Sequence, residues 1–123
     1  MIPIRRISTH AVEDAPAASR PLLQKTIQST PTGRPANLHA QMAHSPAVLT
    51  ARTSLRAALA EHSTFDPKMG AALTLGTAAT VGNGYMIGIA SRLALMNGWT
   101  KEQVTALRTG TPTRDAKIDV LSA

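Results

Sequence analysis

The chain has 123 residues, no cysteine and a formal net charge of +6, and its length is typical of one domain with a substantial core. The absence of cysteine excludes disulfides, thiolate nucleophiles and cysteine-ligated metal sites. The basic residues are scattered, with only Arg5 and Arg6 adjacent, and Trp, Tyr and Phe occur once each, so we expect no nucleic-acid partner.

The composition favours helices. Apolar residues make up 43% of the chain and are mostly aliphatic, with many alanines. Alanine has the best helix propensity and little side chain with which to pack a pleated sheet. We therefore predict an all-α fold of six or seven helices in a single domain.

The first part of the chain is rich in proline. Residues 1–15 show no periodicity and are predicted to form an extended N-terminal arm, with residues 16–123 as the helical domain. A first helix is predicted to begin between Pro16 and Pro21 and to end before the break at "STPTGRPANL". A short helix follows, with Asn37 as its N-cap.

Ser45 followed by Pro46 predicts the start of a longer helix, which should run to about Glu61. Arg52 and Arg56 are expected to face solvent. Apolar residues recur at i, i+3, i+7 and i+11 and form one apolar face of this helix: Val48, Ala51, Leu55 and Leu59.

Asp66-Pro67 repeats the same start signal and predicts a helix that ends near Gly82. A second buried helix is expected over about residues 83–97, with Gly98 just beyond its end.

Thr100 and Gln103 form a capping-box pattern for the next helix, which Gly110 should end. A last helix is expected to begin near Thr113.

Residues 69–91 carry no charge over a length that would span a bilayer. Their glycines, threonines, Asn83 and Ser91 weaken that interpretation. We instead predict a buried helical hairpin in a cytoplasmic protein with no membrane partner. Because this hairpin is too apolar to leave one face open in a small monomer, we also predict an obligate homo-oligomer.

The histidines do not predict a metal site. His39 and His44 are five residues apart, so on a helix their side chains would diverge by about 140°. No acidic residue lies nearby to complete a ligand set. His10 and His62 stand alone in the sequence and receive no role. We expect no metal and no cofactor.

Three stretches together resemble a known family: "EDAPAASRPLLQ", "PANLHAQMAHSPAVLTA", and the long stretch from "DPKMGAALTLG" through "VGNGYMIGIASRLALM" to "NGWTKEQVTALRTG". The chain is similar over roughly residues 12–120 to the alkylhydroperoxidase D / carboxymuconolactone decarboxylase-like family. The resemblance implies an all-helical protein that assembles as a trimer or hexamer.

The redox centre of that family is a Cys-x-x-Cys-x-x-x-His motif on the core helix, with a glutamate on the preceding helix. The resemblance places Asn83 and Met86 at the cysteine positions, Ala90 at the histidine position and Ala71 at the glutamate position. All four functional residues are therefore absent, and the chain has no cysteine elsewhere, so thiol-based peroxide reduction is excluded.

Two functions stay open. The first is a homologue without peroxidase activity that acts as a small-ligand-binding or structural protein. The second is a cysteine-independent enzyme of decarboxylase or hydrolase type acting on a small carboxylate. The candidate ligand contacts, for a small anionic ligand above all, are Tyr85, Arg92 and Trp99.

Overall fold

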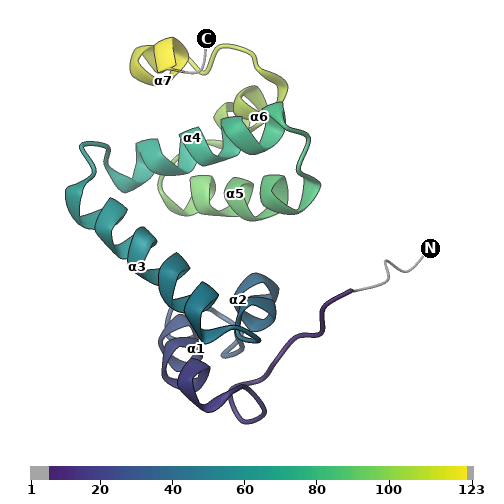
Figure 1. The fold of residues 1–123 in the computed structure, drawn as a ribbon. Helices are drawn as coiled ribbons and strands as arrows, with labels where there is room; N and C mark the ends of the chain where they lie inside the picture. Colours follow the sequence, from purple (N-terminus) through teal and green to yellow (C-terminus); the bar gives the residue numbers. More distant parts are fainter. Residues whose placement is uncertain (1–5, 122–123) are drawn as a thin grey trace. The chain divides into compact units, whose positions relative to one another are not determined.

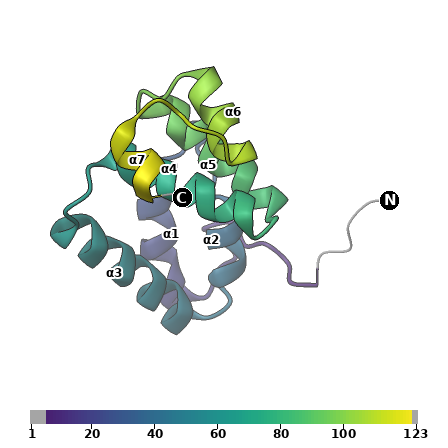
Figure 2. The ribbon, with the colours of Figure 1, turned by 90° about the horizontal axis from the view of Figure 1, so that it is seen from above.

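A computed structural model describes residues 6–121 and contains no strand in that range, which confirms the all-α class. No helix within this range is long and apolar enough to cross a bilayer. The elements are η1 (Ala17–Ser19, a 3₁₀ turn), α1 (Arg20–Ile27), α2 (Asn37–Met42), α3 (Pro46–His62), α4 (Pro67–Thr80), α5 (Gly84–Met96), α6 (Lys101–Thr109) and α7 (Ala116–Leu121), as Figures 1 and 2 show.

The chain divides into two compact units between His62 and Ser63. The N-terminal unit contains the arm, η1 and α1 to α3, and the C-terminal unit contains α4 to α7. The predicted helical domain, residues 16–123, includes helices of both units.

The N-terminal unit has a small core. Leu23 of α1 and Leu49 of α3 are fully buried there, and Ser19 Oγ donates to the Ala43 carbonyl over 2.8 Å. Residues 6–15 form no helix and no strand, and residues 1–5 of the predicted arm lie outside the described range. Val12 and Ala15 of the arm pack against the core, so this segment is docked.

The α3 helix begins where predicted, and Ser45 Oγ accepts from the Val48 amide over 3.3 Å. Its predicted apolar face, however, is open: Val48, Leu55 and Leu59 are 49%, 57% and 60% exposed. The helix has 17 residues, whereas its packing partners η1, α1 and α2 have 3, 8 and 6. Such short elements cover one end of α3 at Leu49 and leave the rest uncovered.

In the C-terminal unit, α4 and α5 pack side by side, and α6 and α7 both pack on α4 (Figure 1). The turn between α4 and α5 passes through Gly82 at φ +68°, a conformation that favours glycine. The core of the unit is aliphatic apart from Trp99: Met69, Ala71, Ala72, Leu75, Ala90, Ala94, Trp99, Val104, Leu107 and Ile118.

The caps define most helix ends. Asp66 accepts from the Met69 amide over 2.8 Å, and Thr100 and Gln103 form the predicted capping box. Gly110 ends α6 at φ +72°. The sequence predicts that the last helix begins near Thr113, whereas α7 begins at Ala116.

Residues just before α7 are held in a loop instead. The Thr113 amide donates to Asp119 Oδ1 over 2.8 Å, and Arg114 has a positive φ of 68°. This backbone conformation is incompatible with a helix that starts at Thr113.

Candidate functional site

Of the four positions that the resemblance assigns to the redox centre, Asn83 and Met86 lie at the α4–α5 turn, whereas Ala71 and Ala90 lie within α4 and α5. Asn83 is the N-cap of α5, and its Oδ1 accepts from the Met86 amide over 3.1 Å. The helix predicted over about residues 83–97 therefore begins one residue later, at Gly84, because the N-cap Asn83 has non-helical dihedrals. Ala71 of α4 and Ala90 of α5 are 8% and 0% exposed within the core cluster.

A hollow of about 420 Å³ opens beside these positions, here called the α4–α5 hollow. Thr77 Oγ1 makes no hydrogen bond to any described residue, whereas Thr74 and Thr80 donate to carbonyls one turn back, at Gly70 and Gly76. The lining contains no ionisable side chain: Leu73, Thr74, Thr77, Ala78, Val81, Asn83 and Met86. The hollow can therefore bind apolar surface and offer a hydroxyl, but its own lining supplies no acid or base.

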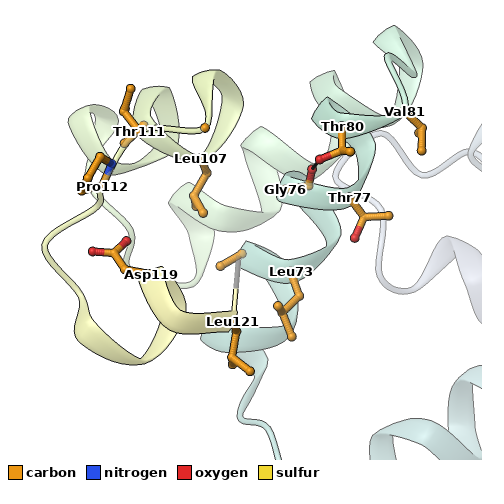
Figure 3. Close-up of a pocket in the computed structure, with 13 residues that line it drawn as sticks. Leu73, Gly76, Thr77, Thr80, Val81, Leu107, Thr111, Pro112, Asp119 and Leu121 are labelled. Carbon is orange, nitrogen blue, oxygen red and sulfur yellow. Dashed lines mark hydrogen bonds between the residues drawn. The ribbon is translucent and has the colours of Figure 1, made fainter. Parts of the chain in front are cut away.

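A second hollow of about 500 Å³, here called the α4–α7 hollow, lies beside the first and shares Leu73, Thr77 and Val81 with it. Figure 3 shows Thr77 on one side of it and Asp119 on the other. Asp119 is the one ionisable residue among those that line it: Ala72, Leu73, Gly76, Thr77, Thr80, Val81, Ala106, Leu107, Gly110, Thr111, Pro112, Asp119 and Leu121.

The carboxylate of Asp119 is occupied by the loop before α7. Its Oδ1 accepts from the hydroxyl of Thr113 over 2.7 Å and from the Thr113 amide over 2.8 Å, and its Oδ2 accepts from the Arg114 amide over 3.1 Å. The Thr113 hydroxyl is the main reason that the pKa of Asp119 lies below its usual value. A carboxylate held ionised by three donors is suited to fixing a loop rather than to transferring a proton.

The three ligand candidates from the sequence do not line either hollow. Tyr85 is 49% exposed at the start of α5, and Arg92 is exposed on the same helix without an ion pair to any described residue. Trp99 is 3% exposed in the core, and its Nε1 donates to the Lys68 carbonyl over 2.7 Å. The Lys68 ammonium lies 4.6 Å from the centre of the Trp99 ring.

Sequence reasoning missed the threonines of α4. Thr74, Thr77 and Thr80 recur every three residues in α4, where every other side chain except that of Lys68 is apolar. Neighbouring residues at this spacing share a helix face, so the three threonines indicate a polar surface on α4 that could line a hollow.

A second feature that sequence reasoning missed lies in the N-terminal unit. His10, which stands alone in the sequence, contacts His44 over 3.2 Å and Asp14 over 3.3 Å, and His44 also contacts Ser8. The interpretation of His10 as isolated is therefore wrong, because the folded arm brings it to a residue 34 positions away. No group of three or more metal-ligating side chains is arranged for a metal within residues 6–121.

His39 on α2 is half-buried, and its Nδ1 has no hydrogen-bond partner among residues 6–121. Burial lowers the pKa of His39 below its ordinary value, and the positive charges of Arg52 and Arg56 lower it further. His39 is thus kept neutral near physiological pH.

One of three comparisons with known proteins found a match. Searches against curated proteins and against solved structures found no match. The sequence model of the carboxymuconolactone decarboxylase family matches residues 46–116, which run from the start of α3 to the first residue of α7. The chain belongs to the carboxymuconolactone decarboxylase family.

Proposed function

We propose that this protein is a non-peroxidase member of its family, one that binds a small, uncharged, mainly apolar ligand in the α4–α5 hollow. The observation that carries the proposal is the lining of that hollow, which is aliphatic apart from two threonines and Asn83 and has no ionisable group. Thr77, whose hydroxyl is not donated to the helix backbone, is the proposed polar anchor.

The positions of the absent redox centre support a binding role. Asn83 and Met86 line the hollow where the family would place two thiols. Since the chain has no cysteine, peroxide reduction through a disulfide has no electron donor in this protein. Measurable consumption of an alkyl hydroperoxide with a dithiol reductant would contradict the proposal.

The alternative, a cysteine-independent decarboxylase or hydrolase acting on a small carboxylate, would need a cation and a proton donor in the same hollow. Arg92 and Tyr85 line neither hollow, and Asp119 is bound by Thr113 and Arg114. These observations favour ligand binding without catalysis and favour an uncharged ligand over an anionic one.

We also propose that the protein acts as a homo-oligomer, a trimer or a hexamer. Large apolar side chains of α3 and α5 are exposed in the single chain, among them Leu55, Leu59 and Met96 at 57%, 60% and 72%. A small protein rarely leaves this much apolar surface in water.

The ligand proposal can be tested with a matched pair of probes, methyl benzoate and benzoate, which have similar shapes but differ in charge. We expect methyl benzoate to raise the melting temperature and to shift amide NMR signals of residues 73–86, whereas benzoate should do neither. Thr77→Val keeps the side-chain shape, removes the hydroxyl and should weaken binding about three- to tenfold.

Arg92→Ala is the matched control and should leave the binding of methyl benzoate unchanged. Binding of benzoate alone, with its loss in Arg92→Ala, would replace our proposal with the enzyme alternative. If neither probe binds, the hollow is not a ligand site of this class.

A further inference from the structure

A chain of polar contacts ties the N-terminal arm to the end of α2. Asp14 Oδ1 lies 3.3 Å from His10 Nδ1, and His10 Nε2 lies 3.2 Å from His44 Nδ1. At the far end, His44 Nε2 lies 3.0 Å from the Ser8 carbonyl and 3.2 Å from its hydroxyl. The two imidazole rings are 4.1 Å apart at their centres and tilted by 52°. We call these four residues the histidine clasp.

The outer contacts determine where the protons lie. An ionised carboxylate and a backbone carbonyl can only accept hydrogen bonds. The Asp14 contact therefore places a proton on His10 Nδ1, and the Ser8 carbonyl places one on His44 Nε2. In two neutral imidazoles, the remaining nitrogens would then face each other with two lone pairs across 3.2 Å.

We propose that His10 and His44 share one additional proton, so that the pair holds a single positive charge that the Asp14 carboxylate offsets. The shared proton converts the contact between the rings from a repulsion into a charge-assisted hydrogen bond. The clasp then holds the arm, in a pH-dependent way, against the connection between α2 and α3 that contains His44.

The sign of the pH dependence follows from the number of protons on the pair. Loss of the shared proton as the pH rises leaves two opposed lone pairs, and a second added proton as the pH falls gives two adjacent cations. The clasp should therefore be closed over an intermediate pH range and should open on both sides of it.

What the clasp holds is the arm. Next to it, the His10 amide donates to the Ala40 carbonyl over 3.0 Å, and Gln41 Nε2 donates to the Ile7 carbonyl over 3.1 Å. These two bonds do not depend on a histidine side chain, so opening of the clasp weakens the docking of residues 6–15 without removing every contact.

The other charged groups of the neighbouring elements do not replace the shared proton. His39 on α2 is kept neutral by burial and by Arg52 and Arg56 of α3. Arg20 of α1 is engaged with the Ala15 carbonyl over 2.9 Å, and Glu13 is exposed. Asp14 is the one carboxylate in contact with either clasp ring within the described residues.

The same geometry argues against Ser8 as a nucleophile activated by His44. The nitrogen that faces the Ser8 hydroxyl also meets the Ser8 carbonyl at the shorter distance of 3.0 Å, so it carries a proton and cannot accept one. Neither hollow is lined by a clasp residue.

The test is a titration of the side-chain ¹⁵N signals of His10 and His44 in the full chain, from pH 4.5 to 9, with EDTA present. We expect two coupled steps for the pair, with Nδ1 protonated in His10 and Nε2 protonated in His44 between the steps. Exchange of the His10 amide with solvent should be slowest in the same interval.

Two variants complete the test. His44→Gln should remove the coupling from the titration of His10 and speed exchange of the His10 amide about tenfold within that interval. Asp14→Asn keeps the shape of the side chain but removes its charge. Without that charge the pair should lose the shared proton at a lower pH, so the upper pH limit of the closed state should fall. His62→Gln, at an exposed position on α3, is the matched control and should change neither signal.

Independent single-step titrations of His10 and His44 in the unmodified chain would overturn the proposal, whatever the variants do. A closed state that forms without EDTA but not in its presence would also overturn the proposal, because a bound metal ion rather than a proton would then join the rings.

Discussion

Single polar side chains beside the two hollows mainly fix the ends of helices. Asn83 caps α5, and Asp119 holds the loop before α7 through the Thr113 hydroxyl and two backbone amides. Thr77 differs from both, because its hydroxyl makes no hydrogen bond to any described residue. A residue's ability to contact a ligand therefore depends on whether its polar atoms are already used by the backbone.

For Asp119 the pH dependence has a definite sign. Because its pKa is lower in the folded chain than in the unfolded one, its stabilising effect is present above the unfolded value of about 4 and is lost as the pH falls through the folded value. Asp119→Asn should lower the free energy of unfolding at pH 7, and the difference from the unmodified chain should shrink below about pH 4.

Urea unfolding at pH 7 and pH 3 measures this difference. Glu102→Gln, in the first turn of α6, is a control that should show a much smaller change. A difference for Asp119→Asn that stays constant between the two pH values would contradict the account of Asp119 as a loop-holding carboxylate.

At the scale of secondary-structure elements, the start of α5 is a place that would suit a dithiol. A thiol at an N-cap lies next to the unpaired amides of the first turn, which stabilise a thiolate. Asn83 occupies this N-cap, and Met86 lies within the first turn. The backbone at Asn83 would therefore suit a reactive thiol, although this chain has none.

Introducing cysteines at Asn83 and Met86 tests whether these two positions correspond to the cysteines of the family's redox centre. The double variant Asn83→Cys/Met86→Cys should form an intramolecular disulfide under mild oxidation, measured by mass spectrometry after thiol labelling. The non-helical dihedrals of the N-cap should allow the close Cβ approach that a disulfide needs. The buried positions Ala71 and Ala90 leave little room for glutamate and histidine, so adding these two changes should lower stability by about 1–3 kcal/mol each.

The matched control for this pair is Arg92→Cys/Leu95→Cys, at the same spacing inside α5 and at exposed positions. Regular helical geometry should keep these two thiols apart. Equal disulfide formation in both double variants, or none in the first, would show that the alignment of Asn83 and Met86 with the redox centre is wrong.

At the scale of the whole molecule, the proposed assembly depends on the apolar face of α3 that the other elements of the N-terminal unit leave open. Leu55 and Leu59 lie one turn apart and are both more than half exposed. Burying the exposed parts of these two leucines in an interface would contribute about 2–3 kcal/mol for each chain. The face is therefore the proposed contact with other copies of the chain.

We expect light scattering at micromolar concentration to give the mass of a trimer or hexamer. Leu55→Lys/Leu59→Lys should shift the mass toward the monomer, because two buried ammonium groups would lose their hydration. Arg56→Ala, on the neighbouring position of the same helix, is the control and should keep the oligomer. A monomeric mass for the unmodified chain would rule out the proposed assembly.

Local sequence signals were sufficient for most of the helices. Asp66-Pro67, the pair Thr100 and Gln103, and Gly110 each act through hydrogen bonds or dihedral angles within a few residues, so the pattern and the structure agree. The end of the chain departs from this rule. Asp119 bonds backward to Thr113 and Arg114, and the helix starts later than its local pattern indicates.

By itself, the sequence determined the all-helical fold, the family and the absence of thiol chemistry, because composition, caps and the lack of cysteine do not depend on distant contacts. Only the tertiary structure decided which polar atoms are occupied and which face a hollow. Thr77 faces two hollows, Trp99 is buried with its indole bonded to Lys68, and His10 meets His44 across 34 positions. Such relations arise from packing between elements, which periodicity along the chain does not encode.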